Sequence, residues 1–555
     1  MLSLIASSCN IDEVIEAEGG IPQIQLEPAS GIFTAKVCRP ITITPTYVNV
    51  DNSTIYAWSS NGEIVSSQPT YTFTPTTAEK VYLRLEVTNQ YGSAKRDLRV
   101  DVVERDVAKL SLAGSAEGFT VAVGDILPLR PHVEACALPI KYSWSIDGEA
   151  VCAERDYDFA AASQGSYRLA LSASTDDGTT EIAFDVRVVT AEEMPLGWHF
   201  EQTEYNVAFG RTILLQPFDI VGGEGAEYEW SIGAEIVSQS KAFEFSADRI
   251  GRYDVSVAMR RGAVSISQSL IVNVCAAEGE YRRTPTAASL AACNKVYELR
   301  VAPGQFINEY FEASTAEEAC RKAEERIARE GYISLGGFGG YIVVGFDHSI
   351  TATGGYDFAV RGNTFDGSSE PGIVYVMQDE NGDGEPNDTW YELAGSETGK
   401  AETWRDYAVT YYRPTASGMS VEWRDNRGNS GVVEYLPTHH DQPSYYPQWI
   451  DTPSYTLRGT RLAERNYDDS GNGSHWVQPS YDWGYADNYS MQDGATDTQL
   501  NRFRIADAID HAGRTVRLAY IDFVKVQTAC NARSGWLGEQ STEVCGIYDC
   551  ALLDE

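Results

Sequence analysis

The sequence predicts a mainly β protein, in which three tandem β-sandwiches precede a larger β-rich domain with one clear helix. Two observations carry this prediction. A tryptophan-centred motif recurs at a fixed interval through the first half, and strand-like apolar runs such as "YIVVGF" and "GIVYVM" recur between loops in the second half. A chain of 555 residues is also too long for one core, so about three to five domains are expected.

The repeated motif reads "YAWSSNGEIV", "YSWSIDGEAV" and "YEWSIGAEIV". It places Trp58, Trp144 and Trp230 at intervals of 86 residues (144 − 58 and 230 − 144). A tryptophan in an early strand, followed by alternating strands and turns, is typical of an immunoglobulin-like sandwich. The motif resembles the PKD-like modules of bacterial surface proteins.

Later in each unit an alternating strand carries a tyrosine, and we expect these three residues to lie in the core like the tryptophans: Tyr82, Tyr167 and Tyr253. The alternative is a set of sugar-stacking platforms. We expect sandwiches at residues 21–105, 106–192 and 193–276, which act as a stalk between a tether at residues 1–20 and a C-terminal ligand-binding β domain at residues 277–555.

The N-terminus, "MLSLIASSCN", resembles a bacterial lipobox in which Cys9 is lipidated. The acidic residues that follow Cys9 resemble the export signal of Bacteroidetes lipoproteins that reach the outer face of the outer membrane. The alternative is a frayed terminus with a chance cysteine. We expect a lipid-anchored cell-surface protein whose only attachment to the membrane is this lipid.

The composition excludes several functions. The 43 Lys and Arg residues against 80 Asp and Glu residues give a net charge of −37, which repels nucleic acid and anionic lipid. No other stretch is apolar enough to cross a bilayer. The ten cysteines contain no CxxC pair, so we expect buried free thiols, with a Cys136–Cys152 bridge as the alternative.

The C-terminal half contains the clearest helix, "STAEEACRKAEERIAREG", for which Ser314 and Glu317 form a predicted capping box and Gly331 a predicted stop. Strands and long loops rich in Tyr, Trp, Asp, Asn and Gly follow it, and we expect a jelly-roll-like arrangement. Long loops on a β scaffold usually carry function.

Three blocks of this half carry a family resemblance: "SLGGFGGYIVVGFDHSI", "YDFAVRGNTFDGSSEPGIVYVMQDENGDGEPNDTWYELAGSE" and "IDFVKVQTACNARSGWLGEQSTEVCGIYD". They resemble the C-terminal domain of Bacteroidetes cell-surface lipoproteins with PKD-like N-terminal domains. The match covers nearly all of residues 295–550. Among these proteins the chain is similar to the BtuH family, whose members bind vitamin B12 beside an outer-membrane corrinoid transporter.

The stretch "DENGDGEPNDTW" begins at Asp379 and predicts a structural calcium site in a β-loop. Alternate carboxylate and amide side chains of a tight loop supply the oxygen ligands that calcium prefers. The match to an EF-hand is incomplete, because its twelfth position is Trp390 instead of a glutamate. The alternative is a solvated Asx-rich turn. The predicted ligands are Asp379, Asn381, Asp383, Glu385 (through its carbonyl) and Asp388.

No catalytic motif is recognisable: HExxH, GxSxG and GxxxxGK[ST] are all absent. The adjacent His439 and His440 point opposite ways on an extended segment and make a poor metal ligand pair. We therefore expect a protein that is not an enzyme.

Two loop-like stretches, "QPSYYPQWI" and "SHWVQPSYDWGYADNYSMQ", concentrate aromatic residues, and "ARSGWLGEQ" adds another. Such mixtures give stiff, amphipathic contact area. The alternative for each residue is core packing. The predicted ligand-binding residues are Tyr445, Tyr446, Trp449, Trp476, Tyr481, Trp483, Tyr485, Asn488, Tyr489 and Trp536.

These features predict a surface lipoprotein that captures vitamin B12 or another corrinoid without transforming it and passes it to an outer-membrane transporter. A surface glycan-binding lipoprotein of a polysaccharide-uptake system is the alternative. A third hypothesis, a glycoside hydrolase, requires a deep cleft with two carboxylates about 5–10 Å apart.

Overall fold

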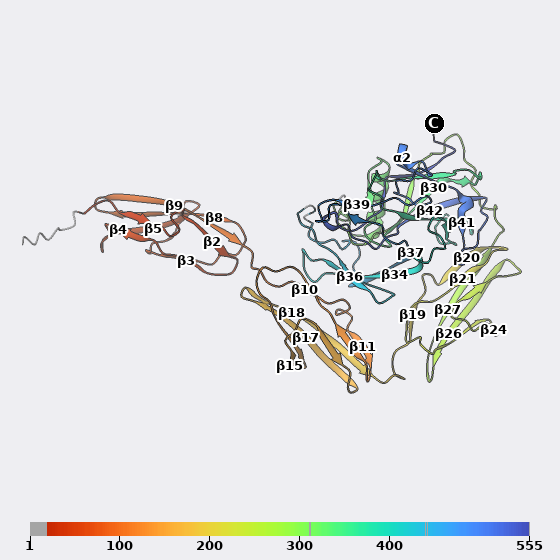
Figure 1. The fold of residues 1–555 in the computed structure, drawn as a ribbon, viewed down its shortest axis with the longest axis horizontal. Helices are drawn as coiled ribbons and strands as arrows, with labels where there is room; N and C mark the ends of the chain where they lie inside the picture. The colour runs from red at the N-terminus through yellow and green to blue at the C-terminus, as the bar shows by residue number, and fades with distance from the viewer. Residues whose placement is uncertain (1–18, 310–311, 439, 441, 554–555) are drawn as a thin grey trace, which may run out of the picture. The chain divides into compact units, whose positions relative to one another are not determined.

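The computed structural model describes residues 19–309, 312–438, 440 and 442–553. The predicted lipidation site at Cys9 lies outside the described residues. Residues 19–107 form one compact unit together with residues 136–140 and 174–179, and the remaining described residues form a second unit. The fold is mainly β, as predicted (Figure 1).

Each of the three repeats contains a five-stranded sheet with one shared strand order, β2-β9-β8-β5-β6 in the first, and the equivalent order in the other two. In each sheet, the strand that comes first in the chain pairs parallel to the strand that comes last, and the other pairs are antiparallel. In chain order the sheet strands are β2 (Ile32–Lys36), β5 (Ile55–Ser60), β6 (Glu63–Ser66), β8 (Lys80–Asn89) and β9 (Gly92–Val103); β11 (Phe119–Ala122), β14 (Lys141–Ile146), β15 (Glu149–Cys152), β17 (Gly165–Thr175) and β18 (Gly178–Val189); and β20 (Glu204–Ala208), β23 (Glu227–Ile232), β24 (Glu235–Ser238), β26 (Gly251–Arg261) and β27 (Val264–Cys275).

Two short strand pairs complete each repeat. They are β1 (Gln23–Gln25) with β4 (Thr46–Val48) and β3 (Ile41–Ile43) with β7 (Tyr71–Phe73); β10 (Leu110–Ser111) with β13 (His132–Val133) and β12 (Ile126–Leu129) with β16 (Tyr157–Ala160); and β19 (Gly197–His199) with β22 (Phe218–Val221) and β21 (Ile213–Leu215) with β25 (Phe243–Phe245).

The repeated tryptophans are core residues, as predicted. Trp58, Trp144 and Trp230 are each 0% exposed. Each indole N–H donates to a backbone carbonyl ten or eleven residues later, at 3.0 to 3.1 Å. This bond lets the whole indole leave water without an unsatisfied donor.

The prediction that all three tyrosines lie in the core is wrong for Tyr82, which is 61% exposed. In β8, Val81 pairs with Val100, as Tyr253 pairs with Val272 in β26. Tyr82 therefore stands one residue later in its strand. A shift of one residue turns a side chain to the other face of the sheet.

The C-terminal domain, here called the head, is built on a six-stranded antiparallel sheet in the order β28-β30-β42-β32-β33-β41. Its buried face is a run of branched apolar residues such as Val344, Val374 and Val524, each 0% exposed. The strands are β28 (Lys295–Arg300), β30 (Tyr341–Thr351), β32 (Gly372–Met377), β33 (Tyr391–Leu393), β41 (Ala508–Ile509) and β42 (Tyr520–Thr528).

Smaller sheets and two helices complete the head. The four-stranded sheet contains β36 (Ser430–Val433), β35 (Val421–Asp425), β34 (Trp404–Tyr412) and β37 (Ser454–Arg461), and the three-stranded sheet contains β40 (Leu500–Phe503), β31 (Phe358–Arg361) and β44 (Gly546–Asp549). The remaining pairs and helices are β29 (Ile333–Ser334) with β43 (Glu543–Val544), β38 (Tyr467–Asp468) with β39 (Trp476–Val477), α1 (Ala316–Ile327) and α2 (Ala495–Thr498).

Helix α1 lies where the sequence predicts it, although its cap is displaced by one residue. Thr315, not Ser314, is the N-cap, and its hydroxyl accepts from the N–H of Glu318 at 3.1 Å. Glu318 in turn accepts from the N–H of Ser314 at 3.0 Å. The apolar face, with Ala319 and Ala323, packs into the head core.

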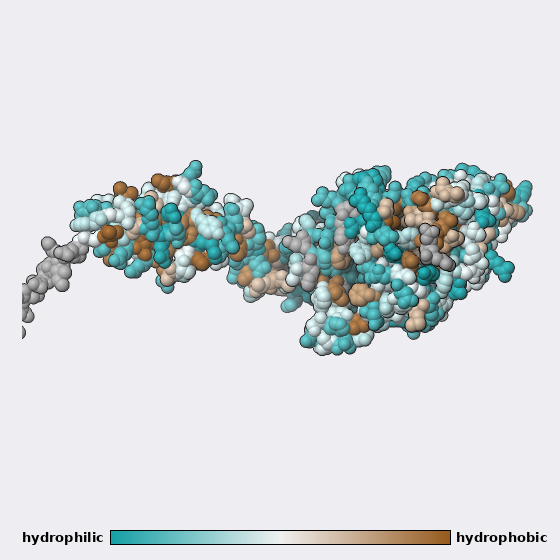
Figure 2. Space-filling view, turned by 90° about the horizontal axis from the view of Figure 1, so that it is seen from above, coloured by the Kyte–Doolittle hydropathy of each residue, from teal (hydrophilic) through white to brown (hydrophobic). Residues whose placement is uncertain are grey.

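The nine described cysteines are free thiols, so the alternative of a Cys136–Cys152 bridge is wrong. Across the residues that the structure describes, no helix has the length and apolar character needed to span a membrane. The face in Figure 2 is largely polar, with apolar residues in small groups.

Candidate functional site

The predicted calcium loop joins β32 to β33. The two oxygens of the Asp379 carboxylate accept from the N–H groups of Gly382 at 2.7 Å and Gly384 at 3.0 Å. Asp383 accepts from the N–H of Glu385 at 2.8 Å. Gly382 and Gly384 have φ of +77° and +76°, a backbone conformation that glycine adopts without strain. The loop is therefore wound around its own carboxylates.

The surroundings of Asp388 indicate whether this loop could bind a cation. Its side chain is 5% exposed, and its Oδ2 accepts from the N–H of Glu380 at 3.1 Å. Its Oδ1 is buried without a hydrogen-bond partner among the described residues. Burial, then the nearby charges of Glu380, Asp379 and Asp383, raises the pKa of Asp388 to about 8. A divalent cation among these oxygens would remove this repulsion, so the loop fits calcium.

The other predicted ligands are held less tightly. The Asn381 side chain accepts from the N–H of Asp383 at 2.9 Å and donates to the Asp383 carboxylate at 2.8 Å. The Glu385 carboxylate forms an ion pair with Lys295 at 3.6 Å, which leaves its backbone carbonyl as the group it can offer.

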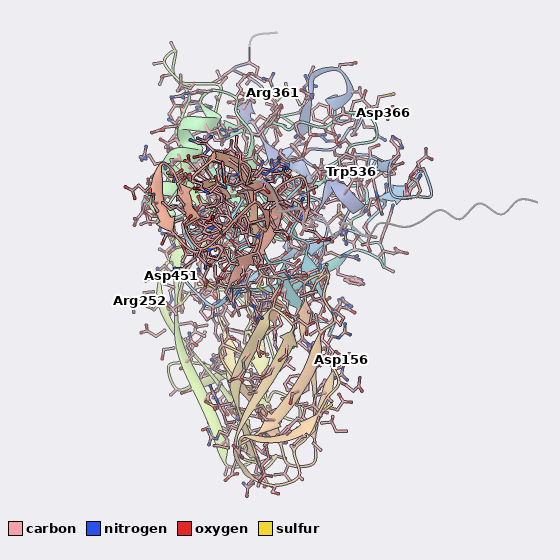
Figure 3. All side chains as sticks on the ribbon, turned by 90° about the vertical axis from the view of Figure 1, so that its left-hand side faces the viewer. Asp156, Arg252, Arg361, Asp366, Asp451 and Trp536 are labelled. Carbon is pink, nitrogen blue, oxygen red and sulfur yellow. The ribbon has the colours of Figure 1, made fainter. Side chains whose placement is uncertain are left out.

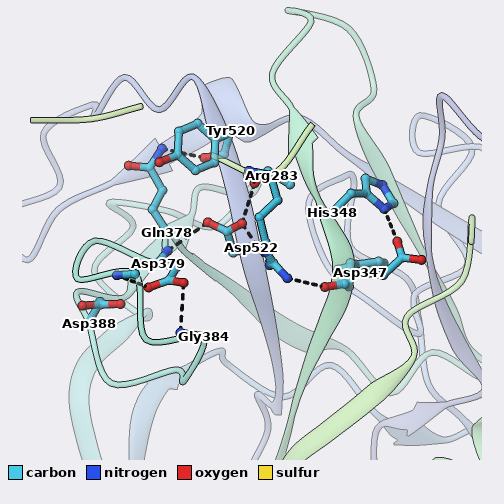
Figure 4. A network of polar contacts seen from close by, with 12 residues as sticks. Arg283, Asp347, His348, Gln378, Asp379, Gly384, Asp388, Tyr520 and Asp522 are labelled. Carbon is cyan, nitrogen blue, oxygen red and sulfur yellow. Dashed lines mark hydrogen bonds and ion pairs between the residues drawn. The ribbon is translucent and has the colours of Figure 1, made fainter. Parts of the chain in front are cut away.

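A polar network ties the loop to the central sheet (Figure 4). Asp522 of β42 is 0% exposed and accepts from the N–H of Asp379 at 2.9 Å. Its other oxygen accepts from Ser349 at 2.6 Å and from Arg283 at 3.1 Å. The start of the loop is thus fixed to two strands of the head.

The third repeat holds the other side of the same loop. Glu380 accepts from the N–H of Ala208 at 2.9 Å and from Arg211 at 3.0 Å. The Asn206 amide donates to Asn387 at 3.1 Å. Sequence reasoning missed this contact, because Arg211 and Glu380 lie far apart in the chain. An ion in the loop would stiffen the junction between the repeat and the head.

Most of the predicted aromatic face is core. The six buried members are at most 8% exposed: Tyr445, Tyr446, Trp449, Tyr481, Tyr485 and Asn488. The hydroxyl groups of the four tyrosines and the side-chain amide of Asn488 have partners in the fold, which permits burial. The Tyr446 hydroxyl donates to the carbonyl of Thr452 at 3.0 Å, for example. The expectation that these residues line an exposed binding face is therefore wrong.

The four other members keep contact with solvent: Trp476, Trp483 and Tyr489 are half-buried, and Trp536 is 45% exposed. Two residues that sequence reasoning missed are also exposed on adjoining segments, Phe365 at 61% and Tyr467 at 49%. Tyr467 pairs with Val477 across β38 and β39, so its side chain leaves the opposite face of this strand pair from that of Trp476. We call Phe365, Tyr467, Trp476 and Trp536 the exposed aromatic cluster. Figure 3 labels Trp536 and Asp366, the neighbour of Phe365.

Three loops carry this cluster, and hydrogen bonds join them. The Trp536 indole N–H donates to the carbonyl of Ser474 at 3.3 Å, and Asn466 donates to Ser534 at 3.1 Å. Gly535 lies against the indole of Trp476, where a Cβ would come within 2.1 Å of the ring nitrogen. The Gln478 N–H donates to the carbonyl of Gly367 at 2.7 Å, which joins the loop of Phe365. The cluster is therefore held on an ordered framework.

Two of the pockets that border the head have linings that do not include this cluster. One, of about 650 Å³, lies between β28 and α1 and is lined by Trp449 and Glu385. The other, of about 290 Å³, lies between the third repeat and the head and is lined by Tyr375, Trp390 and Lys525. Trp449 thus reaches a cavity, although it is separate from the exposed aromatic cluster.

Buried titratable side chains of the head show structural pairing. His348 is 0% exposed and its two ring nitrogens bond to Asp347 at 2.7 Å and Asp549 at 2.8 Å. Burial raises the pKa of Cys530 to about 12, which keeps this thiol protonated and unreactive. His440 bonds to Glu309 at 2.7 Å, whereas His439 lies outside the described residues.

Comparisons with known proteins support the reading of the repeats. The model of a family described as the PKD-like domain matches residues 21–89 and 108–175. No curated protein matches the chain. The N-terminal part therefore contains PKD-like, immunoglobulin-like domains.

Solved structures with some similarity include the immunoglobulin domains 1–5 of Sidekick-1, at 14% identity and a TM-score of 0.18 over 46% of this chain and 59% of that one. An I-band fragment from titin matches at 11% identity and a TM-score of 0.21, over 46% and 98%. Fibronectin(III)-like modules of Clostridium thermocellum CbhA match at 16% identity and a TM-score of 0.19, over 32% and 100%. This chain spans about three fifths of the Sidekick-1 structure.

Proposed function

We propose that this chain is a lipid-anchored cell-surface protein of the outer membrane that captures a corrinoid, such as vitamin B12, without transforming it. The head would bind the ligand, and the PKD-like repeats would act as the stalk. The resemblance of the head to the BtuH family supports this proposal. The single structural observation that supports it is the exposed aromatic cluster.

Four aromatic side chains on joined loops are unusual at a water-facing surface. An exposed group of apolar rings that polar residues surround is typical of a site that binds another molecule. Phe365, Tyr467 and Trp536 each expose about half of their surface or more. Aromatic side chains lose little conformational entropy on binding, so such a cluster binds a flat, rigid ligand efficiently.

A corrinoid matches this surface in chemical character. Its ring is flat and large, and amides surround its edge. The rings of the cluster would contact the face of the corrin, and polar loop residues such as Asp366, Asn472 and Ser474 would bond to the amides. A glycan is the second candidate, because the half-exposed Trp536, fixed through its N–H, is also suited to stack against a sugar.

Calcium bound in the Asp379 loop would support ligand binding indirectly. With the ion bound among Asp379, Asp383 and Asp388, the loop would stay closed against the third repeat. The head would then stand at a fixed orientation on its neighbouring domain. The ion would have no part in any chemical step.

The test is calorimetric titration of the protein with cyanocobalamin, with Trp536→Ala as the variant. We expect wild-type binding and a Kd at least ten-fold weaker for the variant, because a stacked ring typically contributes about 1–3 kcal/mol. Tyr82→Ala, which removes a ring that is at least as exposed from the first repeat, is the matched control and should bind like wild type.

A panel of oligosaccharides forms the second arm of the same experiment. If a sugar released heat and cyanocobalamin at tens of micromolar did not, the ligand would be a glycan instead of a corrinoid. Product release from any sugar would contradict the proposal that the head is not an enzyme.

A further inference from the structure

Three carboxyl groups from distant parts of the sequence meet in the head. Glu370 precedes β32, Asp487 lies in the loop before α2, and Glu543 begins β43. One ligand oxygen from each lies within 4.8 Å of the others. Asp487 is 0% exposed and Glu543 is 6% exposed, whereas Glu370 is half-buried. Two of the three acids are therefore shielded from water, and Glu370 lies at the partly exposed edge of the group.

The backbone of the fold builds this group. The N–H of Glu370 donates to the carbonyl of Asp487 at 3.0 Å, and the N–H of Glu543 donates to the Asp487 carboxylate at 3.0 Å. Gly362 makes room for it, since a Cβ there would come within 2.2 Å of an Asp487 carboxylate oxygen. The three side chains are therefore placed together by ordered structure on all sides.

The partners of these acids are neutral. Glu370 accepts from the Gln478 amide at 3.1 Å and the Ser541 N–H at 3.3 Å, and Asp487 accepts from the Asn363 N–H at 2.9 Å. Among the described residues, no Lys, Arg or His forms an ion pair with any of the three. Buried carboxylates without a cation repel one another strongly.

One oxygen of the group has no partner. Oε2 of Glu543 is buried and makes no hydrogen bond with a described residue. A buried acceptor without a donor is unfavourable, so this oxygen is a candidate ligand for a cation.

We propose that Glu370, Asp487 and Glu543 bind a second calcium ion, distinct from the one in the Asp379 loop. Calcium accepts carboxylate oxygens at about 2.3–2.6 Å in flexible geometry, so any two of its ligands lie at most about 5.2 Å apart. The three ligand oxygens all lie within 4.8 Å of one another, which is close enough for one calcium ion to contact all of them. Magnesium demands a strict octahedron at about 2.0–2.1 Å and keeps several waters, which suits a largely buried group of side chains less well.

The ion would tie together the loops that carry the exposed aromatic cluster. Gln478, which bonds to Glu370, also donates to Ser534 at 3.3 Å. Gln478 is two residues from Trp476, and Ser534 is two residues from Trp536. The bound ion would thus hold the supports of two cluster residues in place.

The test counts calcium ions in the full chain. Protein stripped with a chelator is dialysed against 1 mM CaCl₂, and bound metal is measured by mass spectrometry. We expect Glu543→Gln to bind one ion fewer than wild type and Asp379→Asn to lose a different ion, so that the double variant loses both. Asp366→Asn, an exposed acid four residues from Glu370, is the matched control and should bind as wild type does.

Thermal unfolding separates a metal site from a group of protonated acids. Glu543→Gln keeps the shape of the side chain and removes one buried charge, so its calcium-free form should be at least as stable as wild type. Its gain in unfolding temperature on adding calcium should be smaller than that of wild type. Glu370→Gln, at the partly exposed edge of the group, should behave in the same way.

Equal calcium content in wild type and in both glutamine variants would overturn the proposal. Preferential retention of magnesium by wild type at equal concentrations of the two metals would overturn the choice of calcium. Neither result depends on cobalamin, so the outcome is independent of the proposed function.

Discussion

The repeats and the head bury different kinds of side chain. In the described part of the three repeats, Asp177 is the one carboxylate in the core, and large apolar residues such as Trp58 and Leu85 fill the rest. The head buries many acids, among them Asp487, Asp522 and Glu543. The stability of an apolar core depends little on pH or on ions. A buried acid, in contrast, is stable only when it is protonated, bound to a cation or hydrogen-bonded to a donor. The repeats should therefore be insensitive to calcium and pH, and the head should respond to both.

The largest expected effect tests the apolar side of this comparison. Trp144→Ala removes a fully buried indole and its hydrogen bond to the carbonyl of Arg155. Loss of such a ring costs about 3–5 kcal/mol in the free energy of unfolding. Scanning calorimetry should show one transition move to lower temperature while the transition of the head stays in place. A shift of the head transition by the same amount would mean that the two regions unfold as one.

Removal of calcium should act on the other region. With free calcium at about 100 times Kd, one bound ion stabilises the folded state by about 2.7 kcal/mol. A chelator should therefore lower the unfolding temperature of the head and leave the transitions of the first two repeats unchanged.

Asp379→Asn, which weakens the loop site, should lose part of this response, and Asp366→Asn should retain all of it. If the chelator moved the repeat transitions and not the head transition, the contrast between the two regions would be reversed.

The sequence predicts the repeats well because their pattern is local. Trp58, Trp144 and Trp230 mark a period that no turn or insertion disturbs, and their burial follows from strand alternation. Tyr82 was misassigned because it stands one residue after Val81, which is the position that corresponds to Tyr253. The start of α1 was predicted to within one residue at the cap, whereas the helix ends at Ile327, four residues before the predicted stop at Gly331.

The head is harder to predict because its site residues meet through long-range contacts. The Asp379 loop was found since its oxygens are consecutive in sequence, but Glu370, Asp487 and Glu543 come from three separate segments. The aromatic residues were misjudged for a related reason. A tyrosine such as Tyr446 can be buried only if its hydroxyl finds a partner, here the carbonyl of Thr452, and sequence alone does not reveal that partner.

A smaller effect concerns pH. Burial raises the pKa of Glu539 from 4.5 to about 7, and its carboxylate accepts from the N–H of Gln305 at 2.7 Å. The folded state therefore binds the extra proton between these two values. This contribution to stability is fully present below pH 4.5 and is lost as the pH rises through about 7. The titratable neighbours Tyr411 and Tyr445 stay neutral in this window, since burial raises the pKa of both.

Glu539→Gln should reduce the fall in stability of the head between pH 5 and pH 7.5 by roughly 1–3 kcal/mol, after allowance for partial exposure. Urea unfolding at the two pH values measures the difference. Glu385→Gln, an exposed acid of the head, is the control for loss of one charge. An equal pH dependence in Glu539→Gln and wild type would show that this carboxyl is not among the acids that make the head responsive.

The smallest expected effect on stability belongs to Trp536→Ala. Its ring is 45% exposed, so its removal uncovers little core, and we expect a change of less than about 1 kcal/mol in urea unfolding. The same substitution should weaken the binding of cyanocobalamin at least ten-fold. Trp144→Ala should show the opposite pattern, with a large loss of stability and unchanged ligand affinity. If Trp536→Ala instead destabilised the head by several kcal/mol, the ring would be part of the core, and the exposed aromatic cluster would lose the residue on which its binding role most depends.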